Sequence, residues 1–413
     1  MRRITIVGAG QAGLVLGIGL LEKGYSVTLV TGESAGQIAG GPIRSTQGMF
    51  HDALQIERAL GLDLWDDVAP RIQALQFAMI GPDGAPAIAW RGELDAPASS
   101  VDQRLKFPAW MEIFERRGGQ LDVRAVDVAD LDELARECEL LVVAAGKGDV
   151  RTLFARDAEK SPFYAPQRAL AVCCVRNLRP YDPVRVSFSV VPGAGEFFCI
   201  PGWGAGGACD YLFFEAIPGG PLDRFDGVTA PAARLALTLE LLAEFVPGEY
   251  ERCADVELTD AGATLAGRFA PEVRKPVAQL PSGALAFGLA DTVVLNDPIT
   301  GQGSNNATKA AAAYLAAIVA RGAQPFDAAW MQATFDAHWG AYAAWSTGFT
   351  NALLQPPPPH VQRFLLEASW RPALRRAFVN GFDHPPSLFP WLADPAACEA
   401  FIEAAEVESA VGA

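Results

Sequence analysis

The stretch Ile4-Thr5-Ile6-Val7-Gly8-Ala9-Gly10-Gln11-Ala12-Gly13 joins a β-branched run to a Gly-x-Gly-x-x-Gly turn. Residues 14–24 follow as an apolar segment, and residues 25–30 are again rich in strand-forming side chains. A strand, a glycine turn, a helix and a second strand make one βαβ unit. The sequence therefore predicts a dinucleotide-binding fold.

Each glycine of this turn has a mechanical role. Gly8 makes the tight turn, Gly10 lets a pyrophosphate approach the main chain, and Gly13 lets the helix pack closely on the strand. The phosphates then meet the N–H groups and the positive end of the helix, where Gln11 and Ala12 stand. These five residues are predicted to bind the dinucleotide.

The end of the second strand departs from the usual pattern. A carboxylate normally binds the ribose hydroxyls at this place, whereas this chain has Thr31, with Glu33 two residues later. We expect the Thr31 hydroxyl to contact the ribose instead.

Composition excludes several classes of function. The chain has 413 residues, of which 50% are hydrophobic and 20% charged, and its formal net charge is −15. This balance predicts a globular protein, and so acidic a surface argues against nucleic acid and membrane partners. No apolar run is long enough to span a bilayer, and the seven cysteines show no metal-ligand spacing. We therefore expect a cytoplasmic protein with reduced thiols and no metal.

A second motif lies near residue 300. A predicted strand ends in Gly288-Leu289-Ala290-Asp291, and Asp297-Pro298-Ile299-Thr300-Gly301-Gln302-Gly303 then opens a long Ala-rich helix. These elements resemble the second flavin signature of the para-hydroxybenzoate hydroxylase fold, which favours FAD over NAD. The resemblance implies that Asp291 binds the ribitol and that the positive end of the helix stabilises reduced flavin.

Eight residues of this segment are implied at the flavin: Asp291, Asp297, Pro298, Gly301, Gln302, Gly303, Ser304 and Asn305. The alternative is a purely structural helix that Ser304, Asn305 or Asn306 caps.

Further segments narrow the resemblance. Val101-Asp102-Gln103-Arg104-Leu105, residues 141–147 and residues 161–170, together with the motif at Asp297, resemble the two-component styrene and indole monooxygenases. Members of this family bind FAD that a separate NADH-dependent flavin reductase has reduced to FADH2. Reaction with O2 then gives a C4a-hydroperoxide, which epoxidises a carbon–carbon double bond.

The resemblance also assigns residues outside the two motifs. Arg44, Arg104 and Gly146 stand at family positions near the flavin. The arginines can pair with the pyrophosphate or steady the loop, and the alternative for each is an ordinary salt bridge. The sequence has no second Gly-x-Gly-x-x-Gly that joins a predicted strand to a predicted helix, as a nicotinamide site needs, which agrees with a reductase partner. A homodimer is a further expectation of the family.

The loop entering the active site distinguishes styrene-type from indole-type members. Styrene-type enzymes have a sequence similar to Asn-Thr-Val-Ala-His at the place where this chain has Ser45-Thr46-Gln47-Gly48-Met49. Ala98 stands where styrene-type enzymes carry Ser. Gln47 offers an acceptor to an indole N–H, and Met49 offers a deformable wall to a flat ring. Apolar Ile72 and Leu75 stand where styrene-type members carry Tyr and His.

The resemblance therefore implies indole as the substrate, with styrene-like alkenes and aryl sulfides also oxidised. The predicted substrate site consists of Ser45, Gln47, Met49, Ile72, Leu75, Ala98 and Pro298. No side chain is expected to act as nucleophile or base, because the cofactor supplies the oxidant and the protein supplies position and dryness. The four histidines are interpreted as structural, with His51 the least certain because it follows the pocket loop.

The predicted fold class is α/β: a Rossmann-like FAD domain, an inserted and mainly antiparallel β-sheet substrate domain, and a helical C-terminal region. The expected divisions are 1–44, 99–166 and 276–330 for the FAD domain, 45–98 and 167–275 for the substrate domain, and 331–413 for the C-terminal region. Within them we expect a loop at 33–45, a strand at 87–90, a helix at 107–117, a helix at 231–245 and one antiparallel sheet over 169–217.

Three other interpretations remain open. One is a styrene monooxygenase proper. Another is a self-sufficient flavin hydroxylase of a phenolic acid. In such an enzyme NAD(P)H would reduce the bound FAD directly, without any reductase. The third is a non-enzymatic protein that keeps this fold without flavin, and FAD retained on a desalting column would exclude it.

Overall fold

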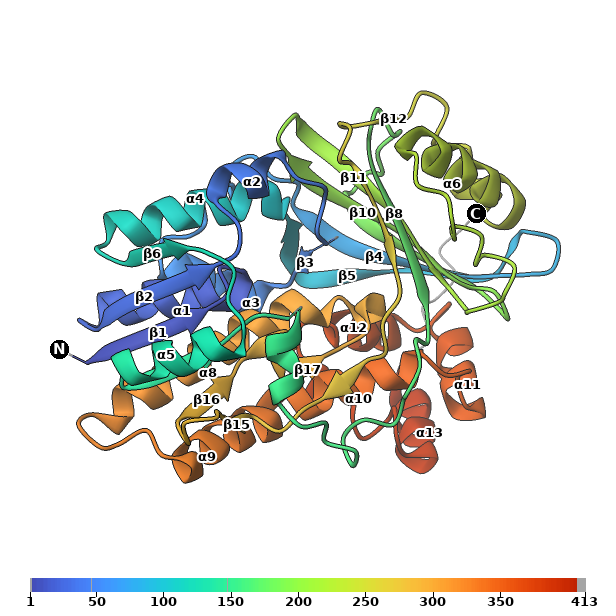
Figure 1. The fold of residues 1–413 in the computed structure, drawn as a ribbon. Helices are drawn as coiled ribbons and strands as arrows, with labels where there is room; N and C mark the ends of the chain where they lie inside the picture. Colours follow the sequence, from blue (N-terminus) through green and yellow to red (C-terminus); the bar gives the residue numbers. More distant parts are fainter. Residues whose placement is uncertain (1, 46, 147, 407–413) are drawn as a thin grey trace.

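The computed structural model describes residues 2–45, 47–146 and 148–406, which fold around two β-sheets that lie side by side (Figure 1). The smaller sheet has the strand order β15-β16-β7-β1-β2-β6. Its strands are β1 (Arg3–Val7), β2 (Ser26–Thr31), β6 (Gln120–Val123), β7 (Leu140–Val143), β15 (Val277–Gln279) and β16 (Leu285–Gly288). All of its pairs are parallel except β15 with β16. Parallel strands that are buried on both faces read as continuous apolar runs, as Leu140–Val143 does.

Helices cover this smaller sheet. They are α1 (Gln11–Glu22), α4 (Gln103–Arg116), α5 (Val128–Glu137) and α8 (Gln302–Arg321). Helix α1 packs against both α4 and α8, whereas α5 contacts β1, β7 and β16. The first ten residues of α1 are all buried, which explains why its sequence is apolar all round.

The larger sheet has the order β12-β8-β11-β10-β9-β4-β5-β3, and β13 pairs with β8. Its strands are β3 (Gly48–Met49), β4 (Ile72–Ile80), β5 (Pro86–Ser100), β8 (Ala169–Arg176), β9 (Arg185–Val191), β10 (Gly195–Gly204), β11 (Gly207–Ala216), β12 (Glu257–Leu258) and β13 (Thr264–Gly267). The run from β8 to β11 is antiparallel, as expected, but β4 pairs with β9 in parallel. The sheet is therefore mixed.

The two faces of the larger sheet have separate cores. Along β11, Tyr211 and Phe213 join a core with the C-terminal helices, whereas Leu212 and Phe214 join a core with α6 (Pro231–Phe245). Alternate residues of a strand point to opposite faces, so both cores draw on the same strands. Figure 1 shows α6 on one side of the long strands and the C-terminal helices on the other.

The remaining elements are mainly helical. They are α2 (Ala35–Gly40), α3 (His51–Ala59), α7 (Pro247–Tyr250), α9 (Ala328–His338), α10 (Ala344–Leu353), α11 (Pro359–Glu367), α12 (Pro372–Asn380), α13 (Pro395–Ala404) and the ribbon of β14 (Glu272–Val273) with β17 (Val294–Leu295). In the described ranges, no helix combines the length and the apolar character needed to cross a bilayer.

The structure confirms α6 over residues 231–245 and corrects three other expectations. Residues 33–45 are not all loop, because a reciprocal capping box between Ser34 and Gln37 starts α2. Strand β5 is much longer than 87–90, since it pairs with both β4 and β3. Helix α4 begins before residue 107, because Asp102 caps it and Pro108 is accommodated inside it.

Candidate active site

The carboxyl ends of β1, β7 and β16 bring three predicted site residues together. Gly8 follows β1, Gly146 follows β7 and Asp291 follows β16. A Cβ on Gly8 would lie 2.6 Å from the Ala144 carbonyl oxygen, and one on Gly146 would lie 2.9 Å from the Asp291 Cβ. Ligands of such sheets bind at this edge, outside the strand ends.

The glycine turn leaves room where a phosphate group would sit. Gly8 has a φ of +117°, and a Cβ on Gly13 would lie only 1.9 Å from the Gly8 carbonyl oxygen. By contrast, a Cβ on Gly10 would meet nothing within 4 Å. No side chain caps the start of α1, and its first turn has no acidic residue. The open space and the uncapped N–H groups fit the pyrophosphate of a dinucleotide.

A second helix start faces the same region. The turn Pro298–Thr300 leads into α8 through Gly301, which has the left-handed φ of +64°. No side chain caps α8, and a Cβ on Gly303 would meet nothing within 4 Å. The start of α8 is therefore a second place where main-chain N–H groups can face negative charge.

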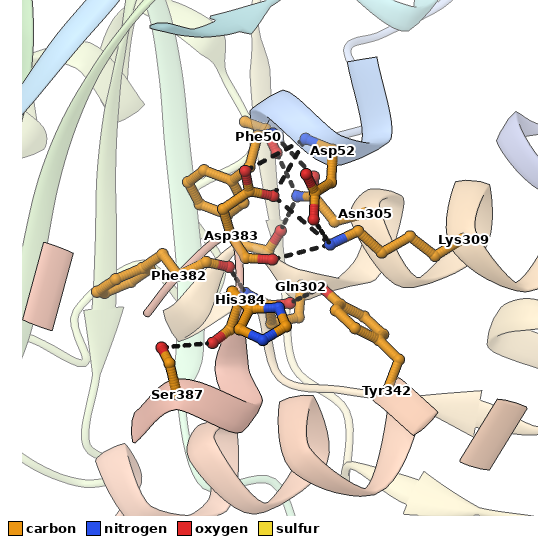
Figure 2. A network of polar contacts seen from close by, with 12 residues as sticks. Phe50, Asp52, Gln302, Asn305, Lys309, Tyr342, Phe382, Asp383, His384 and Ser387 are labelled. Atoms are coloured by element: carbon orange, nitrogen blue, oxygen red, sulfur yellow. Dashed lines mark hydrogen bonds and ion pairs between the residues drawn. The ribbon is translucent and has the colours of Figure 1, made fainter. Parts of the chain in front are cut away.

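The Asn305 side chain attaches the loop at residues 47–50 to α8 (Figure 2). Its Nδ2 donates to the Gly48 carbonyl oxygen at 2.8 Å and to the Gly301 carbonyl oxygen at 2.7 Å, and its Oδ1 accepts from the Phe50 N–H at 2.8 Å. Asn305 does not cap the helix. Its side chain holds the loop at residues 47–50 instead.

Gln302 was expected at the flavin, but the structure uses its side chain elsewhere. The Gln302 Nε2 donates to the Phe382 carbonyl oxygen at 2.7 Å, and its Oε1 accepts from the Tyr342 hydroxyl at 2.6 Å (Figure 2). Only the main chain of Gln302 is left to face a ligand.

Nearby, Lys309 donates to the Asp383 carbonyl oxygen, and both Asp383 carboxylate oxygens accept from the Asp52 N–H. The C-terminal segment is therefore bound to α8 and α3 around the site.

A network of five buried side chains connects the glycine turn to the loop at residues 47–50. The Gln11 Nε2 donates to Glu57 Oε1 at 2.6 Å and to the Thr308 hydroxyl at 2.8 Å. The same Glu57 oxygen accepts from Lys106 Nζ at 2.7 Å. The Gln47 Nε2 donates to Gln11 Oε1 at 3.2 Å. Sequence patterns do not reveal Glu57 and Lys106, because charged residues within helices normally face solvent.

Arg104 and Arg44 have different surroundings. Arg104 is 7% exposed, and its guanidinium contacts Asp102 at 2.7 Å and Asp260 at 2.9 Å. The structure therefore shows Arg104 in ordinary salt bridges, the predicted alternative to a contact with the pyrophosphate. Arg44 pairs with Glu33 at 2.6 Å, and its buried Nε has no partner among the described residues. The Thr31 hydroxyl lies 3.4 Å from the Glu33 carbonyl oxygen.

The predicted substrate residues divide into two groups. Ile72, Leu75 and Ala98 are buried in one apolar core, which also contains Ile299 from the turn before α8. Ile72 and Ala98 are direct partners across β4 and β5. Met49 lies apart, because its side chain packs with Ala53 and Leu54 on α3. Met49 is therefore placed to support the loop, whereas the other three form an apolar wall. Thr46 lies outside the described residues.

Solved structures similar to this one are flavoproteins. The flavin-dependent brominase Bmp2 is 16% identical with a TM-score of 0.65, covering 97% of this chain and 98% of its own. A flavoprotein/dehydrogenase from Cytophaga hutchinsonii is 11% identical with a TM-score of 0.71 and the same coverage. These likenesses show that the chain has the para-hydroxybenzoate hydroxylase-like α/β fold that the sequence predicts.

Relatives identify the family. A model described as "Styrene monooxygenase A putative substrate binding domain" matches residues 146–252. Styrene monooxygenase StyA of a Pseudomonas species is 31% identical over 407 residues, 93% of each chain. StyA of Pseudomonas fluorescens is 34% identical over 321 residues, 75% of each chain. The chain belongs to the styrene monooxygenase family. It is a flavin-dependent monooxygenase, and its cofactor is FAD.

Proposed function

We propose that this monooxygenase epoxidises indole to a product that leads to indigo, and that it also oxidises styrene-like alkenes and aryl sulfides. The observation that carries this proposal is the unpaired acceptor on Gln47. Its side chain is 4% exposed, and among the described residues no donor reaches its Oε1. A buried acceptor without a partner is costly, and a substrate N–H would satisfy it.

The hydrogen-bond chain fixes which end of Gln47 is unpaired. Glu57 Oε1 already accepts from Lys106, and Gln11 turns its amide nitrogen toward that oxygen and its own oxygen toward Gln47. Gln47 must then use its own nitrogen for Gln11, which leaves its oxygen free. An acceptor in this position favours a substrate with a donor, as indole has and styrene lacks.

Backbone conformation supports a functional role for the same residue. Gln47 has a φ of +32°, and Ala290, which precedes Asp291, has a φ of +53°. Residues other than glycine rarely adopt positive φ, and such strain concentrates at active sites. Gln47 contacts Gln11 at the start of α1, and Ala290 precedes Asp291 after β16.

The chain's own residues account for binding and dryness. FAD, when bound, supplies the oxygen-activating chemistry. We propose that the glycine turn and Arg44 hold the cofactor's phosphates, that Asp291 and the start of α8 hold the rest of the cofactor, and that the wall of Ile72, Leu75 and Ala98 excludes water from the substrate. No acid or base side chain is needed for oxygen transfer.

We also propose that a separate NADH-dependent flavin reductase delivers FADH2. The turn Gly8–Gly13 joins a strand to a helix, whereas the same glycine spacing at residues 202–207 falls in the hairpin between β10 and β11. The cofactor itself needs the first turn. Styrene is the second candidate substrate, because both relatives are styrene monooxygenases.

The test is to incubate the protein with FAD, NADH, O2, indole and a generic flavin reductase. We expect indigo to form, and its formation to stop when the reductase is omitted. Catalase added to one arm removes peroxide that leaks from free reduced flavin. Styrene oxide without any indole product would favour the second candidate. NADH consumption without reductase would favour a self-sufficient hydroxylase.

A further inference from the structure

Three strands of the larger sheet gather ionisable residues in its interior. Arg168 immediately precedes β8, Glu196 lies on β10 and Glu215 lies opposite it on β11. Strand alternation places Glu196 and Glu215 on the sheet face that carries Phe198 and Phe213, the face of the core with Ile72 and Ala98. Asp297, at the start of the turn before α8, approaches from the flavin side. The exposed fractions are 5% for Arg168, 6% for Glu196, 0% for Glu215 and 1% for Asp297.

Arg168 is already neutralised by one of the three acids. Its Nε and Nη2 donate to the two Glu196 carboxylate oxygens at 2.6 and 2.9 Å. This is a bidentate pair, the strongest geometry for these groups. The remaining two acids, Glu215 and Asp297, therefore have no cation of their own in the cluster.

The Glu215 carboxyl lacks any donor from its surroundings. Both of its oxygens are buried, and none of the described residues offers either one an N–H or hydroxyl hydrogen. The Asp297 carboxyl lies beside it. Two carboxyl groups can hydrogen-bond only when a proton lies between them, because two carboxylates are both acceptors.

The electrostatic surroundings of Glu215 and Asp297 also favour a proton between the two carboxyl groups. Burial, reinforced by the nearby acids Asp297 and Glu196, raises the pKa of Glu215 well above its usual value, and Arg168 opposes this only in part. Burial also raises the pKa of Asp297. Separating an ionised carboxylate from water without a partner is too costly for the group to stay charged.

We propose that Glu215 is protonated at neutral pH and donates its carboxyl hydrogen to Asp297, acting as a positioning residue for the turn Pro298–Thr300. The Asp297 Oδ1 accepts from the Ile299 N–H at 3.2 Å, so a fixed Asp297 fixes the turn. That turn places Pro298 and Gly301 at the start of α8. The proposed bond connects the larger sheet to the segment at Asp297. This role does not depend on which substrate the enzyme oxidises.

A direct test is infrared spectroscopy of the whole protein at pH 7.5. We expect a carbonyl band of a non-ionised carboxylic acid, shifted in D2O and missing from Glu215→Gln. The matched control is Asp210→Asn, which replaces a half-buried acid of the same strand on its opposite face. Burial raises the pKa of Asp210 only to about 6, so this acid is ionised at pH 7.5 and the band should persist. Absence of the band from the parent protein, or its persistence in Glu215→Gln, would overturn the proposal.

A second measurement tests positioning. Gln keeps a donor of similar size, whereas Leu removes it. We expect oxidised FAD to bind Glu215→Gln within about threefold of the parent affinity and Glu215→Leu at least tenfold more weakly, as measured by fluorescence titration. The melting temperature of Glu215→Gln should rise relative to the parent between pH 6 and pH 9, since Gln cannot lose a proton. Equal FAD affinity of the Gln and Leu variants, or parallel pH profiles of parent and Gln variant, would contradict the role. If the Leu variant does not fold, the pH profile and the infrared band still decide.

Discussion

Lys106 Nζ lies 2.7 Å from Glu57 Oε1, and the two side chains are only 3% and 4% exposed. Burial lowers the pKa of Lys106, and the charge of Glu57 opposes this effect. The ammonium also lies 4.6 Å from the Trp110 ring centre, which adds a cation–π contact. Glu57 Oε1 accepts from both Lys106 and Gln11, so the ion pair also sets the direction of the hydrogen-bond chain that runs through Gln11 to Gln47.

Breaking this pair should cost stability and cofactor affinity. Lys106→Met and Glu57→Leu should each destabilise the protein by about 3–5 kcal/mol, because each leaves a buried charge unpaired. The double variant should lose less than the sum. Denaturant unfolding and FAD titration measure both effects. As the control, Arg224→Ala breaks an exposed pair and should change stability by less than about 1 kcal/mol. Additive single effects would contradict the coupling.

The two glycines of the first turn should respond differently to alanine. Gly13→Ala places a methyl group against the Gly8 carbonyl oxygen, so both folding and FAD binding should fail. Gly10→Ala meets open space, so the melting temperature without FAD should stay within about 2 °C of the parent, on the scale that ~0.5 kcal/mol produces. Its FAD affinity should nevertheless fall, because the methyl group occupies the place of the pyrophosphate. Unchanged FAD affinity of Gly10→Ala would exclude this turn as the phosphate site.

Substrate preference should depend on Gln47. Gln47→Leu removes the acceptor, and kcat/KM for indole should fall about three- to tenfold, the value of one hydrogen bond of ~0.5–1.5 kcal/mol. The values for 1-methylindole and styrene, which have no N–H to donate, should change little and serve as internal controls. Equal losses for all three substrates would mean that Gln47 supports the loop without contacting the substrate.

Acid sensitivity should trace in part to His338. Its ring nitrogen lies 3.0 Å from Asn306 Oδ1 on α8, and burial, with a contribution from Lys309, lowers its pKa to about 4. The unfolded chain takes up this proton near pH 6.5 but the folded protein does not, so the stability is complete above about pH 6.5 and is lost as pH falls toward 4. Between pH 7 and pH 5 the parent should lose about 2 kcal/mol more than His338→Gln. Identical pH profiles in denaturant unfolding would contradict this.

Local patterns in the sequence account for the cofactor motifs but not for what holds them in place. The glycine turn and the segment at Asp297 are each one continuous stretch of sequence. The spacing of residues within each stretch predicts strand, turn and helix. The Glu57–Lys106 pair joins two helices far apart in the sequence, so no local pattern predicts it. The same holds for Glu215, whose position on a strand gives no sign that Asp297 lies beside it.

Sequence patterns also fail to predict the direction in which a side chain points. Ser45, Gln47 and Met49 were predicted to line the substrate site, and the structure shows that strand pairing with β5 turns Met49 toward α3. The register of a two-residue strand depends on its partner, and a shift of one residue reverses every side chain. Ile72 and Ala98, by contrast, belong to long paired strands, and the structure brings them together.

We infer that this protein binds reduced FAD and uses it to oxidise a substrate that donates an N–H. A single-turnover experiment decides between this and the alternatives. The protein is mixed with one equivalent of photoreduced FAD, without reductase or NADH, and then with O2 and equal amounts of indole and styrene. We expect oxidised indole to exceed styrene oxide severalfold in the parent and this preference to vanish in Gln47→Leu. Styrene oxide as the main product, or no oxygenated product from protein shown to bind the flavin, would contradict the account.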